Sequence, residues 1–375
     1  MPSSFDYLPV VTTRKEFMDY LGGVMSAQVA EEEEEEEIER RGRPRELKSY
    51  LFESNTKPPS EFNCGEVAAS IRNTGVDNIK IVNMQSTRAD SFASFFLDIS
   101  DERFWVLHTG ALAEDAHVLV RQLASGPEYQ FDRAWIPTQV LEGLSALPGN
   151  AFNGFGLQYV DLFTPSETPD IPLEELTMTV SGSSASKALK AVRAEEELQR
   201  SISYSKVRIR RGTAANYSKD DLRYDGAFSV KSGSSIDDHM SLVDETKTRY
   251  RELVGSIERF RLGTRETDGI SRIRGKAFNL VFERKIQDFR FFLGRLLDSK
   301  EPFRLWGLGS KASEDYYQVL ALDMHSGSSI DLEISPEFIR AYLPEGACGN
   351  TLLRLYVNLQ HFFDSRVRCE ELVFQ

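Results

Sequence analysis

The residue types that could support catalysis lie in the C-terminal third of the chain. Asp268 is followed by Glu283 and Lys285, and an Asp with a Glu-x-Lys pair on adjacent strands can hold Mg²⁺ and orient a water. A Mg²⁺-dependent nuclease using these three residues is therefore one hypothesis. Apolar residues at helical spacing, however, predict an amphipathic helix over residues 278–296, which turns Glu283 toward solvent. We therefore keep the enzyme as the alternative and favour a protein without catalytic activity.

A second candidate is the arginine-rich hexapeptide at residues 40–45. Gly42 lets the backbone approach a narrow minor groove, Pro44 keeps the chain extended, and the arginines follow the negative potential of A·T-rich DNA. The segment resembles an AT-hook, whose Arg-Gly-Arg-Pro core corresponds to Arg41, Gly42, Arg43 and Pro44, with Arg45 next. The resemblance covers about six residues and implies DNA binding by them without implying a fold.

Acidic residues surround this hexapeptide. Residues 31–37 are all Glu, and Glu39 and Glu46 stand on either side of the arginines. Within a Debye length, about 8 to 10 Å, these carboxylates oppose the approach of phosphate groups. A linker whose opposite charges pair with one another is the alternative interpretation.

A third candidate is the basic segment at Arg208, Arg210 and Arg211. Alternation along a predicted strand places arginines on one face, where they could form a stripe for phosphates. The alternative is that they pair with acidic runs such as residues 195–197. RNA, DNA or an acidic protein fits the stripe equally well.

Motifs for other chemistry are missing from the sequence. The five histidines show no HxH, HxxxH or HExxH spacing, no GxSxG elbow occurs, and the glycine-rich segment at residues 307–311 lacks a phosphate-loop ending. We expect no cofactor and no metal. The favoured function is a non-catalytic binding or scaffold protein whose partner is a protein, a nucleic acid or both.

Composition limits the compartment and the partner. The 375 residues carry 45 Lys and Arg against 58 Asp and Glu, a formal net charge of −13, which argues against a globally basic nucleic-acid binder. Three widely spaced cysteines indicate neither a disulfide framework nor a zinc site. No stretch is apolar enough for a signal peptide or a membrane span. We expect an intracellular protein, cytoplasmic or nuclear, without membrane contact.

Hydrophobic periodicity predicts an α+β fold of two mixed units, with antiparallel hairpins and amphipathic helices, joined by a proline-rich boundary. The expected segments are an N-terminal helical segment (1–25), a mobile acidic and basic linker (26–59), an α+β unit (60–163), a linker (164–174) and a second α+β unit (175–375).

The second unit contains an apparent internal repeat. A Ser-Gly-Ser-Ser sequence begins at Ser181 and again at Ser232, and a basic segment ending in Gly-Thr begins at Arg208 and again at Arg259, so both features recur at a spacing of 51. This pattern predicts a duplication of about 50 residues, comprising residues 181–213 and 232–264.

Overall fold

The computed structural model describes residues 8–33, 46–55, 61–64, 66–125, 131–165, 175–196, 198–267 and 270–372. The chain forms two compact units. Unit 1 comprises residues 1–134, 146–151 and 208–248, and unit 2 comprises residues 135–145, 152–207 and 249–375. The sheets are antiparallel and the class is α+β, as predicted. No helix in the described residues is long and apolar enough to cross a membrane.

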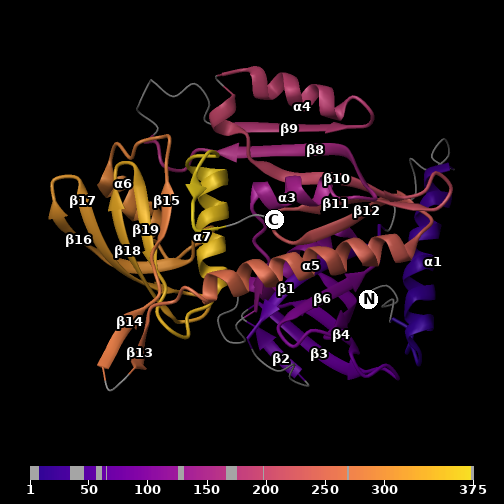
Figure 1. Cartoon of the computed structure of the whole chain (residues 1–375). Coiled ribbons are helices and arrows are strands. Elements are labelled where there is room, and N and C mark those ends of the chain that lie inside the picture. Colours follow the sequence, from indigo (N-terminus) through magenta and orange to yellow (C-terminus); the bar gives the residue numbers. More distant parts are fainter. Residues whose placement is uncertain are drawn as a thin grey trace. The chain divides into compact units, whose positions relative to one another are not determined.

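Unit 1 is built on one antiparallel sheet (Figure 1), with the strand order β2-β3-β4-β5-β6-β1-β12-β11-β10 and with β7 beside β1. Its elements are α1 (Arg14–Glu33), β1 (Lys48–Ser54), β2 (Glu61–Cys64), β3 (Val67–Asn73), β4 (Ile79–Ser86), β5 (Phe92–Asp98), β6 (Phe104–Thr109), α2 (Ala113–Ser125), β7 (Phe131–Arg133), β11 (Tyr217–Arg223) and β12 (Ala227–Gly233). Along the chain, β8 (Asn150–Val160), β10 (Tyr204–Gly212) and α5 (Ile236–Glu258) each run from one unit into the other.

Apolar cores cover both faces of the unit 1 sheet. The two-residue period of a strand sends neighbouring side chains to opposite faces. Accordingly, Phe95 packs in the core that contains α2, whereas Phe96 packs in the core that contains α1. The same alternation in β1 turns Tyr50 and Phe52 toward α2 and leaves Ser49 on the other face.

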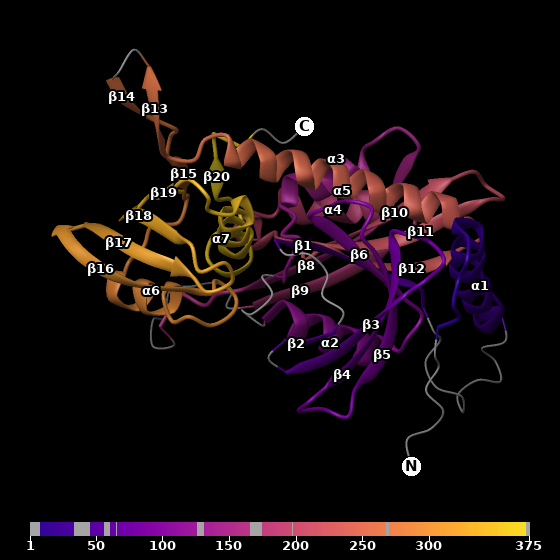
Figure 2. The same cartoon turned by 90° about the horizontal axis from the view of Figure 1, so that it is seen from below.

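Unit 2 contains a second antiparallel sheet, ordered β16-β17-β18-β19-β15-β20 (Figure 2). Its elements are α3 (Thr138–Ser145), β8 (Asn150–Val160), β9 (Glu175–Ser181), α4 (Ala185–Ala194), a 3-10 turn (Gln199–Ser201), β13 (Gly263–Thr267), β14 (Ile270–Arg274), β15 (Phe278–Val281), α6 (Phe289–Leu296), β16 (Leu305–Ser313), β17 (Tyr316–Asp323), β18 (Ser329–Ser335), β19 (Phe338–Tyr342), α7 (Gly349–Phe362) and β20 (Arg368–Cys369). In addition, β8 pairs with β9, and β13 pairs with β14 as a separate hairpin.

The structure corrects part of the predicted linker over residues 26–59, of which residues 34–45 and 56–59 lie outside the described residues. Helix α1 continues to Glu33, and residues 48–54 form β1, whose seven residues are all buried. Strand β1 pairs with β6, β7 and β12 near the middle of the sheet. The polar residues of β1 do not indicate a buried strand in the sequence. They can be buried because each finds a partner inside the protein; Lys48 Nζ, for example, donates to the carbonyls of Glu46 and Ala111.

The predicted helix over residues 278–296 is also wrong. Residues 278–281 form β15, and the helix begins only at Phe289, after the N-cap Asp288, whose side chain accepts from the Phe291 N–H. Phe278 and Leu280 are buried with the period of a strand, while Phe292 and Leu296 are buried with the period of a helix. The strand pattern of β15 followed by the helix pattern of α6 thus resembles the apolar spacing of one long helix in the sequence.

Other predicted segments fall differently in the structure. The two units do not follow one another along the chain, because residues 208–248 belong to unit 1 although the residues before and after them belong to unit 2. The proline-rich segment 164–174 lies in the range assigned to unit 2, and residues 166–174 are outside the described part. Both predicted repeats run strand, helix, strand, but α4 has 10 residues and α5 has 23. The duplication stays a prediction.

Candidate anion-binding pocket

The residues of the AT-hook-like segment, Arg41, Gly42, Arg43, Pro44 and Arg45, lie outside the described residues, and so does Asp268. The nucleic-acid and nuclease roles predicted for them stay predictions.

Glu283 and Lys285 lie in the segment between β15 and α6. A carboxylate oxygen of Glu283 is 2.8 Å from Arg366 Nη1, and Lys285 Nζ is 2.7 Å from Glu337 Oε1. Each side chain therefore already forms an ion pair with a different part of unit 2. Nothing in the described residues brings the two together as a Mg²⁺ site.

The arginines of β10 have partners of their own. Arg208 forms two hydrogen bonds with the carboxylate of Asp221, Arg211 Nη1 is 2.7 Å from Glu245 Oε2, and the Arg210 guanidinium lies 4.3 Å from the ring centre of Tyr217. A phosphate group would have to compete with two carboxylates at this stripe. The nucleic-acid contact predicted here stays a prediction.

A different constellation lies in unit 1, where a polar cavity of about 140 Å³ opens beside β1. Charged groups share its wall with apolar ones. The lining residues are Tyr50, Leu51, Phe52, His117, Val120, Arg121, Arg133, Arg223, Asp225 and Ala227. Concave sites with a few converging polar groups are the usual form of ligand pockets.

Strand β1 and helix α2 provide one side of the pocket. Helix α2 buries Leu119 and Leu123 in the core with Tyr50. His117 and Arg121 stand four residues apart, so they are neighbours along the helix surface beside this buried stripe. Both side chains consequently border the cavity next to Tyr50.

The turn between β11 and β12 provides the opposite side. Gly226 has a φ of +77°, and its carbonyl accepts from the Leu51 N–H at 2.9 Å. A Cβ atom at this glycine would lie 2.9 Å from the Ala134 side chain and 3.0 Å from the Leu51 carbonyl oxygen. Only glycine combines this conformation with this close approach, which places Arg223 and Asp225 at the cavity.

Asp225 organises two of the arginines. Its carboxylate accepts from Arg223 Nε at 3.0 Å and from Arg223 Nη2 at 3.3 Å, and it lies 3.7 Å from Arg133 Nη1. Burial by itself would raise the pKa of Asp225, but Arg223 and Arg133 outweigh it and hold this pKa below its usual range. Asp225 is therefore a permanent anion that orients both guanidinium groups.

His117 is a neutral hydrogen-bond donor in this pocket. Burial lowers the pKa of His117, and burial raises the pKa of Tyr50. The Tyr50 hydroxyl therefore keeps its proton, and its oxygen is 2.7 Å from His117 Nδ1. When the hydroxyl donates this hydrogen bond, the imidazole proton is on Nε2.

The pocket therefore favours negative charge. Three guanidinium groups, from Arg121, Arg133 and Arg223, face one carboxylate, from Asp225, which leaves a surplus of two positive charges. Arginines present fixed pairs of N–H donors that match carboxylate and phosphate oxygens. The lining contains no other acidic side chain.

Nearly the whole chain matches a known family. The sequence profile of the MJECL33-like proteins aligns with residues 7–372. The chain belongs to the MJECL33-like family. One relative is the protein MJECL33 of Methanocaldococcus jannaschii, which is 27% identical over 367 residues, covering 86% of each chain. Every element that lines the pocket falls within the range that matches the family.

A buried polar chain lies on the opposite face of β1 in this member of the MJECL33-like family. Ser49 Oγ is 2.8 Å from His108 Nδ1 and 2.8 Å from His239 Nε2, and His239 Nδ1 is 2.6 Å from Asp220 Oδ1. The order Asp–His–Ser is that of a serine hydrolase. All four side chains are fully buried, however, so a substrate cannot reach Ser49 in this structure. The chain joins β1, β6, β11 and α5.

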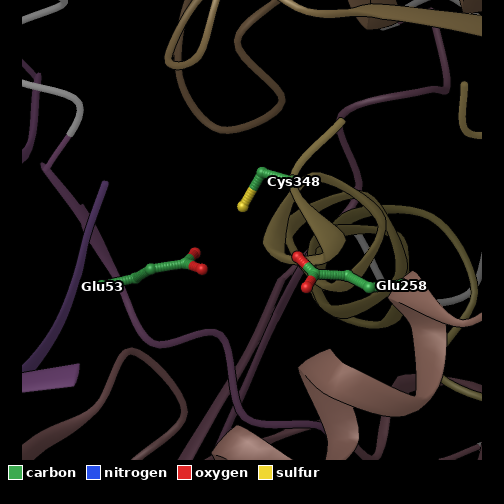
Figure 3. A group of neighbouring side chains, drawn as sticks. All are labelled: Glu53, Glu258 and Cys348. Carbon is green, nitrogen blue, oxygen red and sulfur yellow. The ribbon is translucent and has the colours of Figure 1, made fainter. Parts of the chain in front are cut away.

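The carboxylate of Glu258 lies at the N-terminus of α7, outside the pocket (Figure 3). Glu258 accepts from the Gly349 N–H at 3.0 Å, next to Cys348 at the N-cap, and also pairs with Arg261. Figure 3 also shows Glu53, a buried carboxylate of β1 that pairs with Arg103. Arginine and backbone N–H donors thus already satisfy both carboxylates, so we assign no metal to either.

Sequence reasoning missed the anion pocket because its residues are separated along the chain. Only two local signals existed: the Asp225-Gly226 dipeptide, which is typical of a hairpin turn, and the four-residue spacing of His117 and Arg121, which makes them neighbours where the chain is helical. Neither signal indicates that the two segments meet at Tyr50.

Proposed function

We propose that this protein is a binding protein that recognises a small anion, or the phosphate or carboxylate group of a larger ligand, in the unit 1 pocket. The observation that supports the proposal is a cavity lined by three arginines and the donor His117 against one carboxylate. This agrees with the class expected from the sequence, a binding protein without catalytic activity. The proposed main ligand is a compact anion, in place of the extended polyanion, a nucleic acid, considered from the sequence.

The size of the cavity restricts what enters it. Pockets for drug-sized molecules measure about 300 to 1,000 Å³. The cavity of about 140 Å³ suits one phosphate or carboxylate group better than a whole nucleotide. If the ligand is larger, we propose that its charged end enters and that the rest stays outside the cavity.

The test is calorimetric titration of the full chain with inorganic phosphate and with citrate at low salt. Arg121 lines the pocket from an exposed position, so Arg121→Gln should leave the fold intact. A hydrogen bond to a charged group contributes about 1.5 to 3 kcal/mol, so this variant should weaken binding at least about ten-fold. Arg88→Gln, which removes an exposed charge of unit 1 outside the pocket, is the matched control.

The control should bind like the wild type. If neither anion binds, or if Arg121→Gln and Arg88→Gln weaken binding equally, the proposal is wrong.

A further inference from the structure

The hairpin of β13 and β14 is the most exposed regular element in the described part of unit 2. It extends away from the six-stranded sheet of that unit in both views (Figures 1 and 2). All five residues of β14 are exposed, and Ile270 and Ile273 keep 56% and 84% of their surface accessible. A folded domain gains no stability from such an apolar and basic projection, which indicates a role in contact with a partner.

The register of the hairpin separates two faces. Arg265 lies directly opposite Arg272, and Gly263 lies opposite Arg274. Since side chains alternate, all three arginines share one face of the ribbon with Ile270. The other face carries Thr264, Glu266, Ser271 and Ile273.

The basic face is short of negative charge. Like charges directly opposite each other destabilise an antiparallel pair, and Arg265 and Arg272 have no carboxylate partner within the residues that the structure describes. Arg274 is 2.7 Å from Glu345, but both side chains are more than half exposed, and such pairs contribute little. An anion between the arginines would relieve this repulsion.

The surrounding segment is basic in an acidic protein. Residues 259–276 contain six Lys and Arg against two acidic residues, a net charge of +4, whereas the whole chain carries −13. At the base of the hairpin, Lys276 Nζ lies 4.2 Å from the ring centre of Phe260. A local positive field of this kind directs a polyanion to one part of unit 2.

We propose that the β13–β14 hairpin binds duplex DNA, with its basic face against the major groove and its phosphates. The groove of B-form DNA, about 12 Å wide, admits a two-stranded β-ribbon, whereas the major groove of duplex RNA is too narrow for side chains to read. Five residue pairs at about 3.4 Å each give a ribbon of about 17 Å, long enough to follow the groove. This interaction is independent of the pocket in unit 1.

Fluorescence anisotropy of the full chain with a labelled 20-base-pair DNA tests the proposal, using a salt series. Arg265→Ala/Arg272→Ala removes the two opposed guanidinium groups. The control is Arg290→Ala/Arg295→Ala, which removes the same charge from the exposed face of α6 in the same unit. We expect the hairpin variant to lose at least ten-fold in affinity at low salt and about one to two units of salt slope. The control should stay within about two-fold of the wild type.

Four results would overturn the proposal. The first is no binding of the wild type to the duplex at low salt, and the second is wild-type affinity and salt slope in the hairpin variant. Equal or tighter binding to duplex or single-stranded RNA would refute the choice of DNA. A loss caused by Arg41→Ala/Arg43→Ala, with the hairpin variant unaffected, would assign binding to the N-terminal segment instead.

Discussion

His117 owes its donor role to the hydroxyl group of Tyr50. The side-chain oxygen of Tyr50 is 2.7 Å from His117 Nδ1, and the raised pKa of Tyr50 keeps the proton on this oxygen. Asp225 orients Arg223 and Arg133 in a comparable way from the other side of the cavity. At the scale of residues, the pocket therefore consists of groups that bind an anion and groups that orient them.

Replacing Tyr50 by Phe separates these two roles, because it keeps the ring and removes the hydroxyl. With the His117 tautomer no longer fixed, a hydrogen bond of about 1 kcal/mol to the anion is weakened, which corresponds to about five-fold in affinity. Calorimetric titration with inorganic phosphate measures the change. Unchanged affinity in Tyr50→Phe would show that His117 does not contact the anion.

The buried histidine His108 makes the stability of unit 1 depend on pH. Burial lowers the pKa of His108 to about 3, against about 6.5 in the unfolded chain. Between these values the unfolded state binds a proton that the native state does not. Stability is therefore complete above about pH 6.5 and falls as the pH decreases toward 3, by up to about 1.4 kcal/mol per pH unit.

The corresponding experiment compares thermal midpoints of wild type and His108→Gln from pH 7.5 to pH 4.5. Glutamine can still hydrogen-bond to Ser49 but does not titrate. The variant should be less stable at pH 7.5 and should lose less stability on acidification. Parallel pH curves for both proteins would exclude His108 as the cause.

At the scale of elements, the turn between β11 and β12 decides whether the pocket exists. Gly226 and Gly149 both have positive φ, +77° and +85°, but only Gly226 lies against other atoms. Gly149→Ala should cost about 1 to 2 kcal/mol from the left-handed conformation alone. Gly226→Ala must also displace the Ala134 or Leu51 contacts, so it should cost more and should weaken phosphate binding. Equal melting temperatures and affinities for the two variants would contradict this account of the turn.

Sequence patterns indicate elements whose apolar residues form a continuous run or a single stripe. The antiparallel hairpin of β5 and β6, whose strands are buried on both faces, and the amphipathic helix α2, with one buried stripe, are of the kinds that the sequence predicts. Strand β1 was missed because Lys48, Ser49 and Glu53 are polar, although all three are buried. Their partners come from distant parts of the chain, and no local pattern shows them.

The candidate sites illustrate the same limit. The basic segment at Arg208, Arg210 and Arg211 was visible in the sequence, but the carboxylates that pair with Arg208 and Arg211, Asp221 and Glu245, were not identifiable without the fold. To predict the pocket from the sequence, one would have to know that α2 and the turn at Asp225 meet beside Tyr50. Residue types were predictable, whereas their convergence depended on long-range pairing of strands.

At the scale of the whole molecule, an acidic chain concentrates positive charge in two described places. One is the concave pocket of unit 1, and the other is the exposed β13–β14 hairpin of unit 2. In a chain of net charge −13, such local surpluses of positive charge need a reason. The two proposals supply one for each unit: a compact anion for the pocket and a polyanion for the hairpin.

The most direct test of the central claim is a crystal structure of the full chain with tungstate, a phosphate analogue whose anomalous scattering locates it unambiguously. We predict a tungstate ion in the unit 1 pocket, within hydrogen-bond distance of guanidinium groups from at least two of Arg121, Arg133 and Arg223. Tungstate bound elsewhere on the protein, with the three arginines turned away from an empty or water-filled pocket, would contradict the claim.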